Sequence, residues 1–210
     1  YFQLNSLLKP QVNGQQIVLC AEEGNKIGKT HVNMLLPKAS DRSVEILSGA
    51  EAISSFGITY KSPDETLPEA NASRTMISPL KPNKYDRFLT VFQVADGETK
   101  PFPVTHMTTD VSDVVVFDQH VVSMPKGSSL INRSFEIEVP KGKKPYHVII
   151  NGVEEGDWNL KRSAKHNFNV KVQKGKNTIF FMATAGTYKI STGEDKRVPF
   201  QSKDESLIDK

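Results

Sequence analysis

The chain has 210 residues, of which 37% are hydrophobic and 24% are charged, and its formal net charge is +3. This length suffices to bury a stable core, as one large β-domain or as two small ones. The single cysteine excludes an internal disulfide, and no apolar run approaches the roughly 20 residues that a membrane-spanning helix needs.

Three strand-like segments stand out in the first half of the chain. Residues 1–6 read Tyr-Phe-Gln-Leu-Asn-Ser, residues 31–37 read His-Val-Asn-Met-Leu-Leu-Pro, and residues 85–96 follow a proline-rich turn. Because the chain lacks an initiator methionine and opens inside a strand-like segment, we expect the start of the native protein to be missing. The first three residues fit native sequence and the remnant of an expression tag equally well.

A boundary is expected between Ala95 and Asp110. The intervening residues contain a Gly-centred turn at Gly97 and two prolines, Pro101 and Pro103, which cannot donate to a β-ladder. We therefore predict a β-sandwich segment over residues 1–100, a C-terminal β-sheet region over 101–190 and a polar tail over 191–210. The two β-regions are also compatible with one shared core.

Period-two alternation dominates the second half. Phe135, Ile137 and Val139 alternate with glutamates, which places their apolar side chains on one face of a sheet. Residues 113–117 and 178–182 are apolar on both faces, so both segments are predicted to be central strands.

Turn residues separate these segments at hairpin spacing. Asn151-Gly152, Lys174-Gly175 and Ala185-Gly186 supply residues that adopt positive φ in tight reversals. No segment of ten residues keeps a helical apolar stripe. The predicted fold is all-β, an antiparallel β-sandwich with a smaller C-terminal antiparallel sheet.

Several of these segments resemble heparinase II/III-like polysaccharide lyases. Residues 86–94 are similar to a D-x-F-L-x-V-x-Q-V strand of that family, and residues 31–37 resemble its L-x-V-x-x-L-L-P strand. Residues 1–6 resemble its aromatic-x-x-L-H-S strand, with Asn5 in the histidine position. Residues 186–190 resemble the end of an F-x-x-x-G-x-Y-x-I motif. The first three segments span roughly the first half of the chain.

The resemblance implies that the chain is the C-terminal β portion of such a lyase. It places a helical toroid and the front half of a sandwich upstream as partner regions, and it implies a periplasmic or secreted protein. The parent reaction would be β-elimination on a uronic-acid-containing polysaccharide such as a heparin-type glycosaminoglycan or alginate. In the family the catalytic residues come from those upstream regions, so the resemblance carries no catalytic residue onto this chain.

The residues themselves offer weak candidates for catalysis or metal binding. Tyr146 and His147, with Asn151, could move a proton, but neighbours on a strand point to opposite faces. The five histidines are scattered, without the short spacing of a zinc site. We therefore expect no catalytic residue, no metal and no cofactor.

A local excess of positive charge is the strongest pointer to a binding site. Residues 140–176 hold nine Lys or Arg against three acids, a local balance of +6, so the rest of the chain carries −3. Such a face could attract an anionic polysaccharide. The candidate contacts are Lys143, Lys144, Lys161, Arg162 and Lys165. Lysines in hairpin turns also serve solubility and edge protection, so a solvated-turn interpretation stands beside this one.

Trp158, the single tryptophan, has two interpretations. It could provide a platform on which a sugar ring stacks, or it could be a packed core aromatic. Two functional classes follow. The first is a noncatalytic C-terminal lyase portion that supports the catalytic region and contacts anionic polysaccharide. The second is a freestanding carbohydrate-binding or adhesion β-module, which would present a groove or platform around Trp158. Neither involves nucleic acid or a membrane span.

Overall fold

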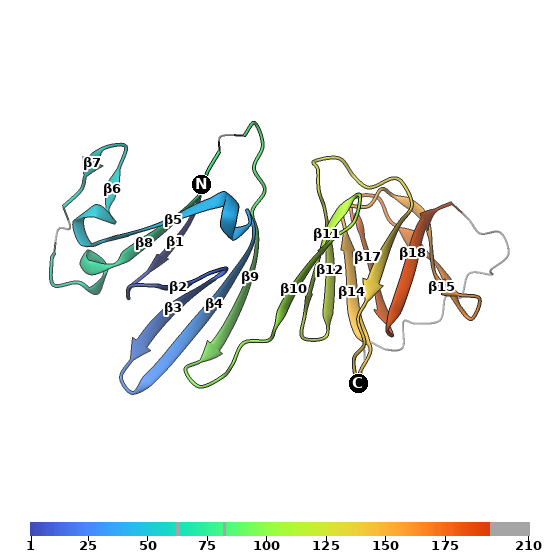
Figure 1. The fold of residues 1–210 in the computed structure, drawn as a ribbon, viewed down its shortest axis with the longest axis horizontal. Helices are drawn as coiled ribbons and strands as arrows, with labels where there is room; N and C mark the ends of the chain where they lie inside the picture. Colours follow the sequence, from blue (N-terminus) through green and yellow to red (C-terminus); the bar gives the residue numbers. More distant parts are fainter. Residues whose placement is uncertain (62–63, 82, 194–210) are drawn as a thin grey trace. The chain divides into compact units, whose positions relative to one another are not determined.

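The computed structural model describes residues 1–61, 64–81 and 83–193, and it divides the chain into two compact units, Tyr1–Phe102 and Pro103–Lys210 (Figure 1). The described residues form β-strands, three short 3-10 turns and no α-helix, which confirms the predicted all-β class. Residues 191 and 192 complete the last strand, and the rest of the predicted polar tail, from residue 194, lies outside the described residues. None of the described residues belongs to a helix long and apolar enough to cross a membrane.

Unit 1 contains two main sheets. The three-stranded sheet has the order β1-β8-β5, and the four-stranded sheet has the order β2-β3-β4-β9. Their strands are β1 (Phe2–Ser6), β2 (Gln11–Asn13), β3 (Gln16–Glu23), β4 (Lys26–Leu36), β5 (Arg42–Ser48), β8 (Ser73–Pro79) and β9 (Leu89–Asp96). A two-stranded ribbon of β6 (Ser54–Ser55) and β7 (Ile58–Thr59) completes the unit. The 3-10 turns are η1 (Ala39–Asp41), η2 (Gly49–Glu51) and η3 (Pro68–Asn71).

The core of unit 1 joins these two sheets. Leu4 and Ile77 from the smaller sheet pack with buried residues of β3 and β4. The three family-like segments meet beside this core, because β4 pairs with β9 and the ring of Phe2 on β1 stacks on Phe88 at 5.9 Å between centroids. Long-range pairing therefore brings together segments that are more than fifty residues apart in the chain.

Arg42 is a buried cation of unit 1. Its side chain is 6% exposed, and Nη1 donates to the carbonyl oxygens of Met34 (2.8 Å) and Pro37 (2.7 Å). Nη2 donates to the carbonyl oxygen of Gly14 at 3.3 Å. Burial lowers the pKa of the guanidinium, because desolvation disfavours the charged form. These bonds hold the chain around the cis peptide bond between Leu36 and Pro37.

Unit 2 is a sandwich of two larger sheets. The five-stranded sheet has the order β10-β11-β12-β14-β17, and the four-stranded sheet has the order β13-β18-β15-β16. The strands of the first are β10 (Val104–Thr108), β11 (Ser112–Phe117), β12 (His120–Pro125), β14 (Tyr146–Asn151) and β17 (Thr178–Ala183). Those of the second are β13 (Phe135–Val139), β15 (Gly156–Ser163), β16 (His166–Val172) and β18 (Gly186–Thr192). The C-terminal region is thus two facing sheets with their own core, where the sequence predicted one smaller sheet.

One pair of strands departs from the antiparallel rule. β12 and β14 are parallel, with Val121 opposite Val148, because the intervening strand β13 belongs to the other sheet. The chain crosses the sandwich twice before it returns beside β12. Buried residues from both sheets, including Ile137, Ile150 and Leu160, form one continuous core.

The structure corrects the prediction that residues 178–182 form a central strand. β17 is the edge of its sheet and pairs with β14 alone. Its exposure alternates strictly, so Ile179 and Phe181 are buried while Phe180 is 57% exposed and Met182 is also exposed. The outward positions carry large apolar residues, and these conceal the alternation in the sequence. Residues 113–117, by contrast, lie centrally in β11, where Asp113 to Val116 are buried.

Candidate functional site

Strand register places two basic loops at the same end of unit 2. Val139, the last residue of β13, lies opposite Gly186, and Tyr146, the first residue of β14, lies opposite Ala183. The loop between them therefore borders the β17–β18 turn. This loop carries Lys143 and Lys144, which are both exposed.

The second basic loop is the β15–β16 hairpin, and Arg162 ties it to the same turn. Nη1 of Arg162 donates to the Thr184 hydroxyl at 2.7 Å and to the Ala185 carbonyl oxygen at 2.8 Å. Nη2 lies 3.0 Å from Nδ1 of His166 across the hairpin. Lys165 lies in this hairpin and is exposed. We call the residues Lys143, Lys144, Arg162 and Lys165 the basic end of unit 2.

Lys161 belongs to a different surface from its neighbour Arg162. It lies on the outer face of the four-stranded sheet, directly opposite Lys189 on β18 and Asn167 on β16. Sequence reasoning did not include Lys189. Its signal was the alternation of Tyr188, Lys189 and Ile190, in which only the lysine is exposed.

Amide side chains adjoin these lysines on the outer face. Asn159 is 4% exposed, and its Nδ2 donates to Oδ1 of Asn167 at 2.7 Å and to Oδ1 of Asn169 at 2.8 Å. The three asparagines lie on β15 and β16, in adjacent cross-strand positions. Sequence reasoning missed this cluster as well, although Asn159, Asn167 and Asn169 all fall on the polar positions of alternating strands.

Trp158 lies in the core of unit 2, so the structure removes it from the candidate substrate contacts. The side chain is 1% exposed, and Nε1 donates to the Glu154 carbonyl oxygen at 2.9 Å. A ring enclosed in this way offers no face to a sugar. The alternation of β15 turns Trp158 inward and its neighbour Asp157 outward.

The weak candidates for catalysis do not converge. Tyr146 is buried, whereas His147 points to the other face of β14 and stacks between His120 (5.3 Å) and Phe180 (6.0 Å). Among the described residues, no group of three His, Cys, Asp or Glu side chains could hold a metal ion. His106 and Asp113 form a pair, with 3.0 Å between Nε2 of His106 and Oδ1 of Asp113.

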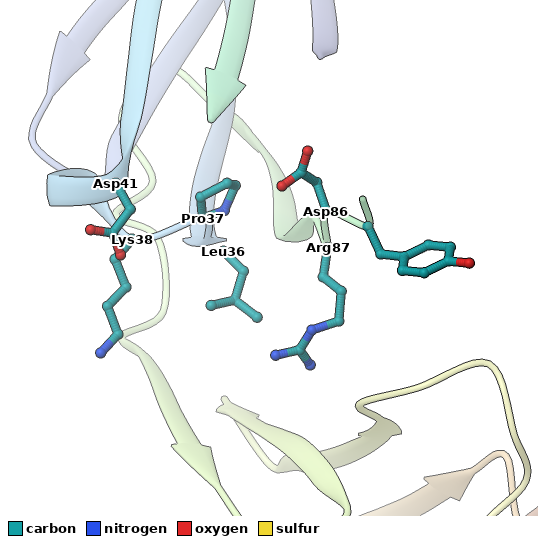
Figure 2. A pocket seen from close by; sticks show the side chains of 7 residues that line it. Leu36, Pro37, Lys38, Asp41, Asp86 and Arg87 are labelled. Atoms are coloured by element: carbon teal, nitrogen blue, oxygen red, sulfur yellow. The ribbon is translucent and has the colours of Figure 1, made fainter. Parts of the chain in front are cut away.

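Unit 1 contains shallow pockets that sequence reasoning did not single out, and one of them lies beside the cis proline Pro37. Its volume is about 200 Å³, and it is lined by Leu36, Pro37, Lys38, Asp41, Tyr85, Asp86 and Arg87. Figure 2 shows side chains of both charges around its rim, with Lys38 and Asp41 on one side and Asp86 and Arg87 on the other. Five of the pocket's seven lining residues belong to two of the family-like segments, residues 31–37 and 85–96, and Lys38 and Asp41 follow the first of them. Its mixed charge gives no preference for an anionic ligand.

Comparison with known families bears on unit 2. Residues 106–192 match the heparinase II C-terminal domain. This match confirms the predicted resemblance to the C-terminal portion of heparinase II/III-like lyases. A search of curated protein sequences found no protein that matches the chain.

The residues that match the heparinase II C-terminal domain include every residue of the basic end and of the outer-face surface. The basic end, Lys161, Lys189 and the asparagine cluster all lie between residues 106 and 192. Of the four family-like segments in the sequence, residues 186–190 fall inside the matched range. The other three lie in unit 1 and outside it, and their assignment stays a prediction.

Proposed function

We propose that this chain is the noncatalytic C-terminal β portion of a heparinase II/III-like polysaccharide lyase, and that it supports the catalytic region. The match of residues 106–192 to the heparinase II C-terminal domain carries this proposal. The parent reaction is then β-elimination on a uronic-acid-containing polysaccharide, in a periplasmic or secreted enzyme.

The noncatalytic role rests on the placement of the titratable side chains in unit 2. β-Elimination needs one group that neutralises the uronate carboxylate and another that removes the C5 proton. Tyr146 and His147 lie on opposite faces of β14, and His147 is stacked between two rings. In unit 2, as far as the structure describes it, these two side chains do not converge on one substrate atom.

Contact with anionic polysaccharide is the second part of the proposal, and the basic end is the surface for it. Arg162 fixes the β15–β16 hairpin against residues 184 and 185, and the loop with Lys143 and Lys144 borders the same turn. Charges gathered at one end of a domain reinforce one another within the Debye length of about 10 Å at ordinary salt. Dispersed charges would be screened individually.

The alternative of a freestanding carbohydrate-binding or adhesion module loses its main support. That interpretation required a platform or groove around Trp158, and Trp158 is buried. The basic end, in contrast, suits a linear polyanion without any aromatic platform.

Chromatography on heparin resin tests the basic end. Retention of the purified chain should weaken steeply with salt, and it should fall further in a Lys143→Ala, Lys144→Ala double variant and in Lys165→Ala. The Lys9→Ala, Lys100→Ala double variant is the matched control. It removes the same amount of charge, and both exposed lysines lie in unit 1. Equal retention of the two double variants would leave only the solvated-turn interpretation of the basic loops.

A further inference from the structure

We infer that the outer face of the β13-β18-β15-β16 sheet holds a subsite for a sulfate or carboxylate group, formed by Lys161, Lys189 and Asn167. This subsite is separate from the basic end. The inference rests on the proposed function only for the source of that group, an acidic saccharide.

The two lysines form a like-charge pair across neighbouring strands. Lys161 on β15 is directly opposite Lys189 on β18, and both side chains are exposed. Directly opposite side chains have Cβ atoms about 5 Å apart, and like charges there destabilise a sheet. Neither ammonium group forms an ion pair with a described residue, although Glu136 lies directly opposite Lys189 on β13. An external anion between the ammonium groups would relieve the repulsion.

Asn167 extends the row of donors by one strand. It lies opposite Lys161 on β16, so Lys189, Lys161 and Asn167 occupy three neighbouring strands with a spacing of about 4.8 Å. All three side chains lie on the outer face, because the residues beside Lys161 and Lys189, Leu160 and Ile190, are in the core.

Asn159 orients the amide of Asn167. The Oδ1 atom of Asn167 accepts a 2.7 Å hydrogen bond from Nδ2 of the buried Asn159, which directs the Asn167 amide nitrogen away from Asn159. The amide oxygen, the group that would repel an anion, is thereby engaged within the protein. Asn159 is thus a positioning residue, and the row presents hydrogen-bond donors. Ammonium and amide donors on one face match the oxygens of a sulfate or carboxylate.

Isothermal titration calorimetry of the full chain with a heparin-type hexasaccharide tests the subsite. Lys189→Gln and Asn167→Ala should each weaken binding, Lys189→Gln by about tenfold. Glu136→Gln should strengthen binding by about threefold, because it removes a carboxylate beside Lys189. Asn159→Leu should weaken binding without changing any charge. Titration with inorganic sulfate shows whether the isolated anion occupies the same site.

Variants of the two surfaces separate the two proposals. If Lys143→Ala, Lys144→Ala weakens binding while Lys189→Gln, Asn167→Ala and Glu136→Gln do not change it, the subsite is overturned and the basic end stands. If the outer-face variants alone change binding, the subsite stands and the basic end is overturned. A wild-type chain that binds neither the hexasaccharide nor sulfate overturns both. The fluorescence of Trp158 verifies that each variant is folded.

Discussion

The guanidinium of Arg162 donates a 2.7 Å hydrogen bond to the hydroxyl of Thr184, which joins the β15–β16 hairpin to the turn between the two sheets of unit 2. The side chain of Arg162 also packs closely against the backbone of Gly186. A Cβ atom on Gly186 would lie 2.8 Å from Cδ of Arg162, and Gly186 has a φ of 140°. The arginine therefore has a structural role in addition to its charge.

Replacement of Arg162 by alanine should lower the free energy of unfolding by about 1 to 2 kcal/mol, because the bonds to Thr184 and Ala185 are lost. Urea denaturation measures the change. Lys165→Ala removes one charge from the same hairpin and should stay within about 0.5 kcal/mol of wild type. Equal stability of both variants would contradict the structural role of Arg162.

Trp158 should behave as a core residue in every assay. Trp158→Ala should destabilise unit 2 by about 3 to 5 kcal/mol, whereas Phe180→Ala, on the exposed edge strand, should cost about 1 kcal/mol. Acrylamide should quench Trp158 fluorescence weakly in the native chain, and added saccharide should leave the emission unchanged. A shift of the Trp158 emission on addition of saccharide would contradict the core position of the indole ring.

Arg42 should be indispensable for unit 1. Arg42→Met leaves the carbonyl oxygens of Met34, Pro37 and Gly14 without their donor, so the free energy of unfolding should fall by about 2 to 4 kcal/mol. Lys38→Met, an exposed cation four residues earlier, is the control. Circular dichroism during urea denaturation follows both variants. Similar urea midpoints for Arg42→Met and Lys38→Met would contradict a stabilising role for the buried hydrogen bonds of Arg42.

Asp96 provides a test of pH dependence. The side-chain hydrogen bond from Thr99, followed by the bond from the Thr99 backbone N–H, holds the pKa of Asp96 below its ordinary value. A carboxyl with a lower pKa in the folded state stabilises the protein above its unfolded-state pKa, and this contribution disappears as the pH falls through the folded-state pKa. Asp96→Asn should therefore be less stable than wild type at neutral pH, and thermal unfolding should show the difference shrinking in acid. A stability difference between wild type and Asp96→Asn that does not change with pH would contradict a stabilising role for the ionised Asp96 carboxylate.

The chain by itself should have no lyase activity, because Tyr146 and His147 lie on opposite faces of β14 and do not converge on one substrate atom. Incubation of the purified chain with heparin-type or alginate oligosaccharides should produce no ultraviolet absorbance from unsaturated uronate. The appearance of that absorbance, and its loss in a Tyr146→Phe, His147→Ala variant, would contradict the noncatalytic assignment.

The sequence predicts local structure well where alternation is clean. Phe135, Ile137 and Val139 form the buried face of β13 as expected, and the Gly186 turn begins β18. The prediction of a central strand was wrong for residues 178–182, because Phe180 and Met182 place large apolar side chains on the outer face of an edge strand. The residue type gives the size and polarity of a side chain. It does not show whether a strand lies at the edge of a sheet, because that position depends on which strands pair.

Local patterns along the chain predict the all-β class, the excess of positive charge over residues 140–176 and the resemblance to the lyase family, since each depends on residues that are close together in the sequence. Tertiary packing sets the inward orientation of Trp158, the parallel pairing of β12 with β14, and the position of Lys161 opposite Lys189. Lys161 and Lys189 are 28 residues apart in the chain and lie opposite each other through strand register. Register is set by packing between distant segments, and a period of two in one strand leaves its partner undetermined.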